Sequence, residues 1–214
     1  MKTVEIFSGT KSFSNVAEER GHETFTIDNN SELSPTIVHN LLLDTMPVEI
    51  VEAIYSADII WMSPPCTTFS MAAGNTHWTA DRQPKTQDAE DGLKLLLLCK
   101  NIAEWCDSVG KYYCIENPRA RARWFLPEKS RHTVWYCQYG DSRAKPTDIW
   151  TNVPNFIPKI CKNGNPDCHH ERAPRGSKTG TQGLTQINRG AVPHKLIEKL
   201  LELVECELPA HNLM

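Results

Sequence analysis

Residues 1–28 have the sequence MKTVEIFSGTKSFSNVAEERGHETFTID, which predicts the first strand–helix–strand unit of the chain. Apolar and β-branched residues over Thr3–Phe7 and Thr24–Asp28 are typical of strands. Between them, Ser14–Arg20 has helical spacing and is followed by Gly21, a residue that commonly ends helices. A helix between two such strands indicates a parallel pair joined by a crossover connection.

The same alternation continues through the first two thirds of the chain. Short apolar runs and helical spacing predict three more strands over 36–38, 58–62 and 111–116, and two helices over 48–55 and 88–108. Further strands are expected over 133–137 and 148–151, and a last helix from Pro193 to about residue 205. We therefore predict parallel βαβ units within a doubly wound, three-layer α/β fold, whose ligands bind at the carboxyl ends of the strands.

Length and composition predict one compact domain, because the chain has 214 residues of which 40% are hydrophobic and 23% charged. Its longest apolar run, 95–98, is far shorter than the roughly 20 residues of a membrane-spanning helix. Its start has no apolar signal-peptide stretch, and eight cysteines are too few for a disulfide scaffold. We expect a soluble, non-secreted, cytoplasmic monomer without a membrane partner.

Charge is divided unevenly along the chain. Residues 1–60 hold three Lys/Arg and ten Asp/Glu, whereas residues 111–200 hold sixteen and seven, a balance of +9. The net charge of the whole chain is only -3. This asymmetry predicts a polyanionic partner for the second half.

Three motifs follow predicted strands. Ser63-Pro64-Pro65-Cys66 places a cysteine at the sheet edge, where it is either a small buried side chain or a nucleophile. Glu116 closes a neighbouring strand and could face the same crevice as a catalytic acid, or be a solvated charge. The turn of residues 7–12, with Asp28 about 20 residues after it, suggests a site for a nucleoside-containing cofactor.

In order and spacing these motifs resemble those of the DNA cytosine-5 methyltransferases. The resemblance spans about residues 3–205. It rests on Phe7-Ser8-Gly9, Asp28, Pro64-Pro65-Cys66 with Phe69-Ser70, Glu116-Asn117, Arg143-Ala144-Lys145 and Gly190-Ala191-Val192-Pro193.

The resemblance implies a Rossmann-like S-adenosylmethionine-dependent fold and a cytosine C5 methyltransferase acting on DNA. Cys66 would attack C6 of a flipped-out cytosine, Glu116 would contact the base, and Arg143 would brace the base, either alone or together with Glu116. The cofactor would lie against Phe7, Ser8, Gly9, Thr10, Ser12, Asp28, Asn29, Ser63 and Pro64. Asn40 and Asp44 are alternative contacts for its adenine. Residues 1–151 would be the catalytic cofactor-binding domain, 152–187 a reduced target-recognition segment, and 188–214 a C-terminal helix packing back on that domain.

Several residues depart from the family pattern. Thr67 and Asp141 stand where members usually carry Gln, and Pro118 where they carry Val. The recognition segment is also far shorter than usual, so sequence specificity is expected to be relaxed or limited to short sites.

DNA contacts are expected from basic residues of the second half, although a solvated charged face with an anchoring aromatic pair is the alternative. The candidates are Arg119, Arg121, Arg123, Lys145, Arg172, Arg175, Lys178 and Arg189. Trp124 and Phe125 lie among them and could stack on bases.

A cluster of four potential zinc ligands, Cys161, Cys168, His169 and His170, lies in the recognition segment. Its C-x6-C-H-H spacing matches no standard zinc finger, so we favour a plain DNA-facing loop over zinc binding.

Other functions stay open. Lys11 beside the cofactor turn could neutralise a carboxylated S-adenosylmethionine in a carboxymethyl transferase, or simply be solvated. A cysteine-dependent enzyme of free pyrimidine nucleotides would leave the basic half without a purpose. A non-catalytic DNA-binding relative would not need Cys66, Glu116 and Arg143 together.

Overall fold

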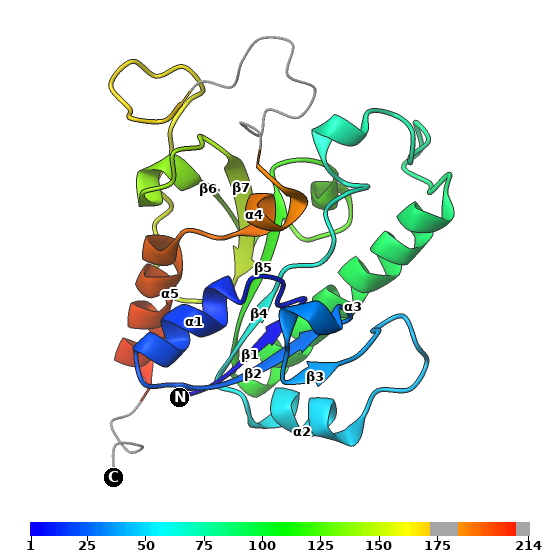
Figure 1. The fold of residues 1–214 in the computed structure, drawn as a ribbon, viewed down its shortest axis with the longest axis vertical. Helices are drawn as coiled ribbons and strands as arrows, with labels where there is room; N and C mark the ends of the chain where they lie inside the picture. The colour runs from blue at the N-terminus through cyan, green and yellow to red at the C-terminus, as the bar shows by residue number, and fades with distance from the viewer. Residues whose placement is uncertain (172–183, 209–214) are drawn as a thin grey trace.

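The computed structural model describes residues 1–171 and 184–208 and shows a seven-stranded sheet with helices on both faces (Figure 1). The strands are β1 (Lys2–Ile6), β2 (Glu23–Asp28), β3 (Ile37–Val38), β4 (Ile59–Met62), β5 (Tyr112–Pro118), β6 (Arg131–Trp135) and β7 (Pro146–Thr151). The helices are α1 (Ser12–Glu19), α2 (Val48–Ser56), α3 (Gln87–Val109), α4 (Gln186–Gly190) and α5 (His194–Glu207). The predicted α/β, Rossmann-like fold is confirmed.

The strand order is β3-β2-β1-β4-β5-β7-β6. The first five strands pair in parallel, as the strand–helix alternation predicts. The sequence pattern did not give the direction of the last two strands, and β7 runs antiparallel to both β5 and β6. Residues 136–145 between β6 and β7 are too few for the crossover that a parallel pair requires. The strand predicted over 133–137 also ends early, since residues Tyr136–Tyr139 form a 3-10 helix.

Two hydrophobic cores lie on opposite faces of the sheet. Ile60 and Met62 of β4 pack with α2 and α3, whereas Ile59 and Trp61 pack with α1 and α5. Alternate side chains of a strand point to opposite faces, so both faces of β4 are buried. The carboxyl ends of the central strands lie at the top of Figure 1, near α4 and the yellow loop of residues 160–171.

The last helix, α5, packs against α1 (Figure 1). Glu205 of α5 accepts hydrogen bonds from Arg20 Nε (2.8 Å) and lies 2.7 Å from His22 Nε2. The predicted division of the chain into a catalytic domain (1–151), a recognition segment (152–187) and a C-terminal part (188–214) stays a prediction. Among the described residues, no helix is long and apolar enough to cross a membrane.

Glu5 of β1 is a buried carboxyl group that meets the first turn of α1. Its two oxygens accept the backbone N–H groups of Phe13 (3.2 Å) and Ser14 (2.9 Å). Burial raises the pKa of Glu5 to about 7, although these hydrogen bonds favour the charged form.

This raised pKa predicts that folding stability depends on pH through Glu5. The folded protein retains the proton up to about pH 7, whereas the unfolded chain releases it near pH 4.3. Stabilisation by the protonated group is therefore complete below about pH 4.3, the pKa in the unfolded chain, and is lost as pH rises to about 7. The loss is at most about 4 kcal/mol.

Urea unfolding of the native chain and of Glu5→Gln between pH 5 and pH 8 measures this dependence. The free energy of unfolding of the native chain, relative to the variant, should fall as pH rises. A difference that is constant with pH would contradict the raised pKa.

Candidate active site

The ends of β4 and β5 bring two predicted motifs to one edge of the sheet. Met62 pairs with Ile115, so the chain leaving β4 and the last residues of β5 lie side by side. Asn117 is fully buried, and its side-chain N–H donates to the carbonyl oxygen of Pro64 over 3.1 Å. This bond fixes the segment that carries Cys66 against the strand that carries Glu116.

Cys66 begins a tight turn and is half-buried. Its carbonyl oxygen accepts the backbone N–H groups of Phe69 (3.1 Å) and Ser70 (2.9 Å). Burial raises the pKa of the Cys66 thiol, and the Glu116 carboxylate raises it further. The positive charges of Lys145 and Arg189 act in the opposite direction. The structure therefore gathers a thiol, a carboxylate and two cationic side chains at this edge.

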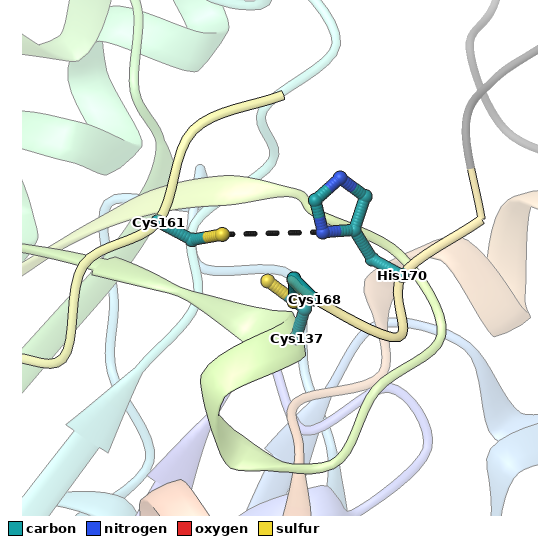
Figure 2. Close-up of side chains that lie close together, drawn as sticks. All are labelled: Cys137, Cys161, Cys168 and His170. Carbon is teal, nitrogen blue, oxygen red and sulfur yellow. Dashed lines mark hydrogen bonds between the residues drawn. The ribbon is translucent and has the colours of Figure 1, made fainter. Parts of the chain in front are cut away.

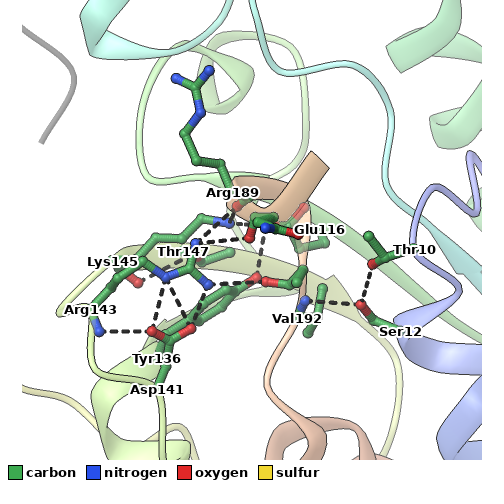
Figure 3. Close-up of polar contacts among 12 residues, drawn as sticks. Thr10, Ser12, Glu116, Tyr136, Asp141, Arg143, Lys145, Thr147, Arg189 and Val192 are labelled. Atoms are coloured by element: carbon green, nitrogen blue, oxygen red, sulfur yellow. Dashed lines mark hydrogen bonds and ion pairs between the residues drawn. The ribbon is translucent and has the colours of Figure 1, made fainter. Parts of the chain in front are cut away.

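Glu116 is 6% exposed and has two side-chain neighbours from the β6–β7 region (Figure 3). The hydroxyl of Tyr136 donates to Glu116 Oε1 over 2.9 Å, and Lys145 Nζ lies 3.8 Å from the same oxygen. Lys145 Nζ also donates to the carbonyl oxygen of Arg189 (3.0 Å). Burial raises the pKa of Tyr136 well above its usual value, and the Glu116 carboxylate adds to this shift, so the hydroxyl keeps its proton.

Arg143 forms no hydrogen bond or ion pair with Glu116, so it does not brace this carboxylate directly, and its expected contact with the base stays a prediction. Its guanidinium pairs with Asp141, with Nε 2.9 Å from Oδ1. It also donates to the carbonyl oxygens of Asn188 (3.4 Å), Arg189 (3.2 Å) and Ala191 (3.3 Å). Arg143 therefore holds the chain before α5 in place, and Lys145 is the cation beside Glu116.

The turn after β1 has an unusual backbone, with Phe7, Gly9 and Lys11 all at positive φ. Gly9 has a φ of 46°, a conformation that side chains disfavour. The N–H of Gly9 donates to Asp28 Oδ2 over 2.9 Å, which ties the turn to the tip of β2. The hydroxyl of Ser8 is buried and has no hydrogen-bond partner within the described residues.

Other candidate cofactor residues surround this turn. Thr10 and Ser12 share a hydrogen bond of 2.8 Å, and Ser12 Oγ accepts the N–H of Val192 (3.2 Å), so the closing motif meets the first turn (Figure 3). Ser63 accepts the indole N–H of Trp61 (2.8 Å). Asn29 is exposed beside Asp28.

The two candidates for an adenine contact both follow β3. Asn40 accepts the N–H of Leu42 (3.0 Å), and Asp44 is exposed, so the alternative between them stays open. The ammonium group of Lys11 donates to the carbonyl oxygen of Ser34.

Two of the expected DNA contacts have other roles. Arg121 is 7% exposed and donates to the carbonyl oxygens of Ser70 (2.7 Å) and Gly74 (2.5 Å). Arg123 forms a bidentate pair with the buried Asp148, at 2.5 and 2.7 Å. These guanidinium groups hold protein segments together and are not free for phosphates.

The remaining candidates differ in their positions. Arg119 is exposed, with its guanidinium 5.6 Å from the ring centroid of Trp135. Arg189 is half-buried, and its Nε has no partner in the described part of the chain. In Figure 3 its guanidinium extends away from the polar cluster around Glu116. Arg172, Arg175 and Lys178 lie outside the described residues.

Trp124 and Phe125 pack into an aromatic cluster with Phe69 and Trp78, which corrects their expected exposure to bases. Trp78 is 3% exposed and its indole N–H donates to the carbonyl oxygen of Thr68 over 2.7 Å. Trp78 therefore anchors the middle of the segment of residues 67–86, which connects Cys66 to α3.

The sequence analysis missed Tyr136, and it placed Lys145 among the DNA contacts only. Tyr136 lies within a predicted strand, where an aromatic residue is common and carries no functional signal. Its approach to Glu116 depends on the antiparallel β7, which the sequence analysis did not predict.

Comparisons with known proteins place this site in a wider context. No protein-family model matches the chain. It is 29% identical over 223 residues, covering 95% of this chain and 100% of the relative, to a protein of Frog virus 3 (isolate Goorha) named "Probable DNA (cytosine-5)-methyltransferase".

Similar solved structures include a mutant of Spodoptera frugiperda DNMT2, with 17% sequence identity and a TM-score of 0.42. The match covers 80% of this chain and 57% of that chain. S. pombe Dnmt2 methyltransferase is 15% identical, with a TM-score of 0.41 and coverage of 70% and 48%. This chain thus spans about half the length of these two structures.

The contacts of Arg121 predict that its replacement destabilises the protein. Arg121→Gln should lower the free energy of unfolding by about 2–3 kcal/mol, because two backbone carbonyl oxygens lose charged donors. Urea unfolding measures the loss. Arg119→Gln is the matched control, since Arg119 is exposed and should change stability by no more than about 0.5 kcal/mol. Equal effects of the two substitutions would contradict the assigned role.

Proposed function

We propose that this chain, a relative of the DNA cytosine-5 methyltransferases over nearly its whole length, methylates carbon 5 of cytosine in DNA. One observation carries the proposal beyond homology. Cys66 is the nucleophile in this mechanism, and Glu116 is the acid that binds the base. Cys66 follows β4, whereas Glu116 lies in the adjacent parallel strand β5, and the Asn117–Pro64 hydrogen bond joins the two segments. The electrostatic interaction between them supports the proposal that they share one site.

The residues around the first turn fit S-adenosylmethionine. Asp28 is a carboxylate at the tip of β2, suited to ribose hydroxyls, and the Ser8 hydroxyl is buried without a partner in the described part. Thr10, Ser12, Asn29, Ser63 and Pro64 would complete the site, with Asn40 or Asp44 facing the adenine. When bound, this cofactor supplies an electrophilic methyl group.

Cys66 would make the cytosine reactive, because C5 of the free base is a poor nucleophile. Its thiolate adds to C6 and leaves an enamine that is nucleophilic at C5. The raised pKa means that the free protein holds a neutral thiol at pH 7, so the proton must leave as the base binds. Lys145 and Arg189 provide the positive charge that favours the thiolate.

Glu116 would bind N3 and the exocyclic amine of the base while charge develops on the ring. Tyr136 and Lys145 fix the carboxylate in position through contacts of 2.9 and 3.8 Å. After methyl transfer, water takes up the C5 proton and the C6–sulfur bond breaks, which releases the Cys66 thiolate and restores the aromatic ring.

The target base must leave the DNA stack, or be presented single-stranded, for C6 to become accessible to a thiolate. Arg119, Lys145 and Arg189 are the described candidates for contacts with DNA at this edge of the sheet, with the recognition segment of residues 152–187. The alternative of a carboxylated cofactor stays a prediction, because the Lys11 ammonium donates to the carbonyl oxygen of Ser34 but an ammonium group has three donors.

We expect DNA from cells that express this chain to contain 5-methylcytosine, because Cys66 can activate the base. Nucleoside digestion followed by mass spectrometry measures it. Cys66→Ala should abolish the product, whereas the exposed Cys206 can be replaced by Ala without effect. A product heavier than methylcytosine would favour a modified cofactor, and full activity of Cys66→Ala would overturn the mechanism.

Asp28→Ala should weaken binding of S-adenosylmethionine by about 1.5–3 kcal/mol, the usual contribution of a hydrogen bond to a charged group. Isothermal titration calorimetry measures the affinity. Asp58→Ala is a matched control, because Asp58 also accepts a backbone N–H (that of Lys2, 2.8 Å) but lies at the opposite edge of the sheet. An unchanged affinity of the Asp28 variant, or an equal loss in both, would remove Asp28 from the cofactor site.

A further inference from the structure

Three thiols and one imidazole converge outside the proposed active site (Figure 2). Cys161, Cys168 and His170 come from one irregular loop, and Cys137 comes from the 3-10 helix after β6. Their four potential ligand atoms all lie within 4.8 Å of one another. Cys161 Sγ is 3.9 Å from His170 Nδ1.

These separations are close to those of a tetrahedral zinc site. Zinc binds sulfur at about 2.3 Å and imidazole nitrogen at about 2.0 Å, which places neighbouring ligand atoms about 3.5–3.8 Å apart. The cysteines are free thiols, so disulfide bonding does not explain their proximity. A contraction of the cluster by about 1 Å would complete the coordination.

The loop of residues 157–171 has no apolar core of its own, although backbone hydrogen bonds at Lys159 and Glu171 hold its two ends. It contains no helix or strand, and its apolar residues Ile157 and Ile160 are 81% and 72% exposed. Even so, His170 is 8% exposed, so its imidazole is turned inward toward the thiols. A bound metal stabilises a segment that is too short and polar to form a core.

We propose that Cys137, Cys161, Cys168 and His170 bind one zinc ion as a structural site. Four protein ligands leave no open position, which distinguishes a structural site from a catalytic one. The sequence pattern pointed to His169 instead of Cys137, and it favoured a plain loop. His169 is exposed, and its Nε2 lies 3.0 Å from the carbonyl oxygen of Asp141, so it is not in the cluster.

Groups around the cluster suit metal-bound thiolates. The side-chain amide of Gln138 donates to Cys168 Sγ (3.5 Å), and that of Asn165 donates to Cys161 Sγ (3.7 Å). Such outer hydrogen bonds orient the ligands of a metal site. One contact must change on binding, because a zinc ion at Nδ1 leaves the ring proton on Nε2, which now accepts the N–H of Gly164 (3.2 Å).

The site would tie the recognition segment to the proposed active site. Cys137 follows Tyr136, whose hydroxyl donates to Glu116. On the other side, the N–H of Glu171, next to His170, donates to the carbonyl oxygen of Ser142 (2.8 Å), beside Arg143. The metal would thus fix the start of the chain that leads into residues 172–183.

Metal analysis of the full chain, purified under reducing conditions without chelators, tests this site. We expect about one zinc per chain. Cys161→Ser and Cys168→Ser should each lower the content at least fivefold, while Cys206→Ser, at an exposed cysteine of α5, should retain it. This readout does not require methyl transfer, so its failure would leave the proposed enzyme activity untouched.

Cobalt provides a second measurement that does not depend on the variants folding. The native chain, stripped of metal by a chelator, should take up one equivalent of Co²⁺ and show the intense visible bands of tetrahedral thiolate coordination. Absence of zinc from the native chain together with absence of these bands would overturn the proposal. So would a disulfide between two of the cluster's cysteines in protein whose thiols were blocked at lysis, or equal metal loss in Cys206→Ser.

Discussion

The hydrogen bond from the buried Asn117 side chain to the Pro64 carbonyl oxygen joins the ends of the two central strands, and the proposed site depends on it. Pro64 and Pro65 have no N–H groups, so this segment cannot continue the hydrogen-bond ladder of the sheet in the ordinary way. A side-chain N–H of Asn117, on the neighbouring strand, instead donates to the carbonyl oxygen of Pro64 and links the two segments. Its own oxygen is buried without a partner in the described residues, a cost that folded proteins usually avoid. The arrangement fixes Cys66 beside Glu116.

The charges at this edge form one connected group. Glu116 accepts from Tyr136 and lies near Lys145, whose ammonium also holds the carbonyl oxygen of Arg189. Burial alone would keep Cys66 a neutral thiol, so activation depends on the balance between the nearby carboxylate and the two cations. Entry of a base that satisfies Glu116 would shift that balance toward the thiolate. Binding and activation are thereby coupled in the proposed mechanism.

Local patterns were enough to predict the parallel half of the sheet and the strand ends that carry Cys66, Glu116 and Asp28. The remaining features depend on contacts between distant segments. Inserting β7 between β5 and β6 brings Tyr136 to Glu116 and Asp148 to Arg123. The position of β7 also explains why counting charges overestimated the basic surface. Arg123 is paired with the buried Asp148, and the sequence alone does not distinguish such an arginine from a free one. Cys137 was likewise overlooked because its partners lie in a later loop.

The central claim is that the thiolate of Cys66 attacks C6 of cytosine. An oligonucleotide with 5-fluorocytosine tests this most directly, because fluorine at C5 prevents the release of the enzyme after transfer. The full chain should form a stable complex with this DNA and S-adenosylmethionine, and peptide mass spectrometry should locate the bond at Cys66. Absence of a complex under conditions that give 5-methylcytosine, or a bond at another cysteine, would contradict the account.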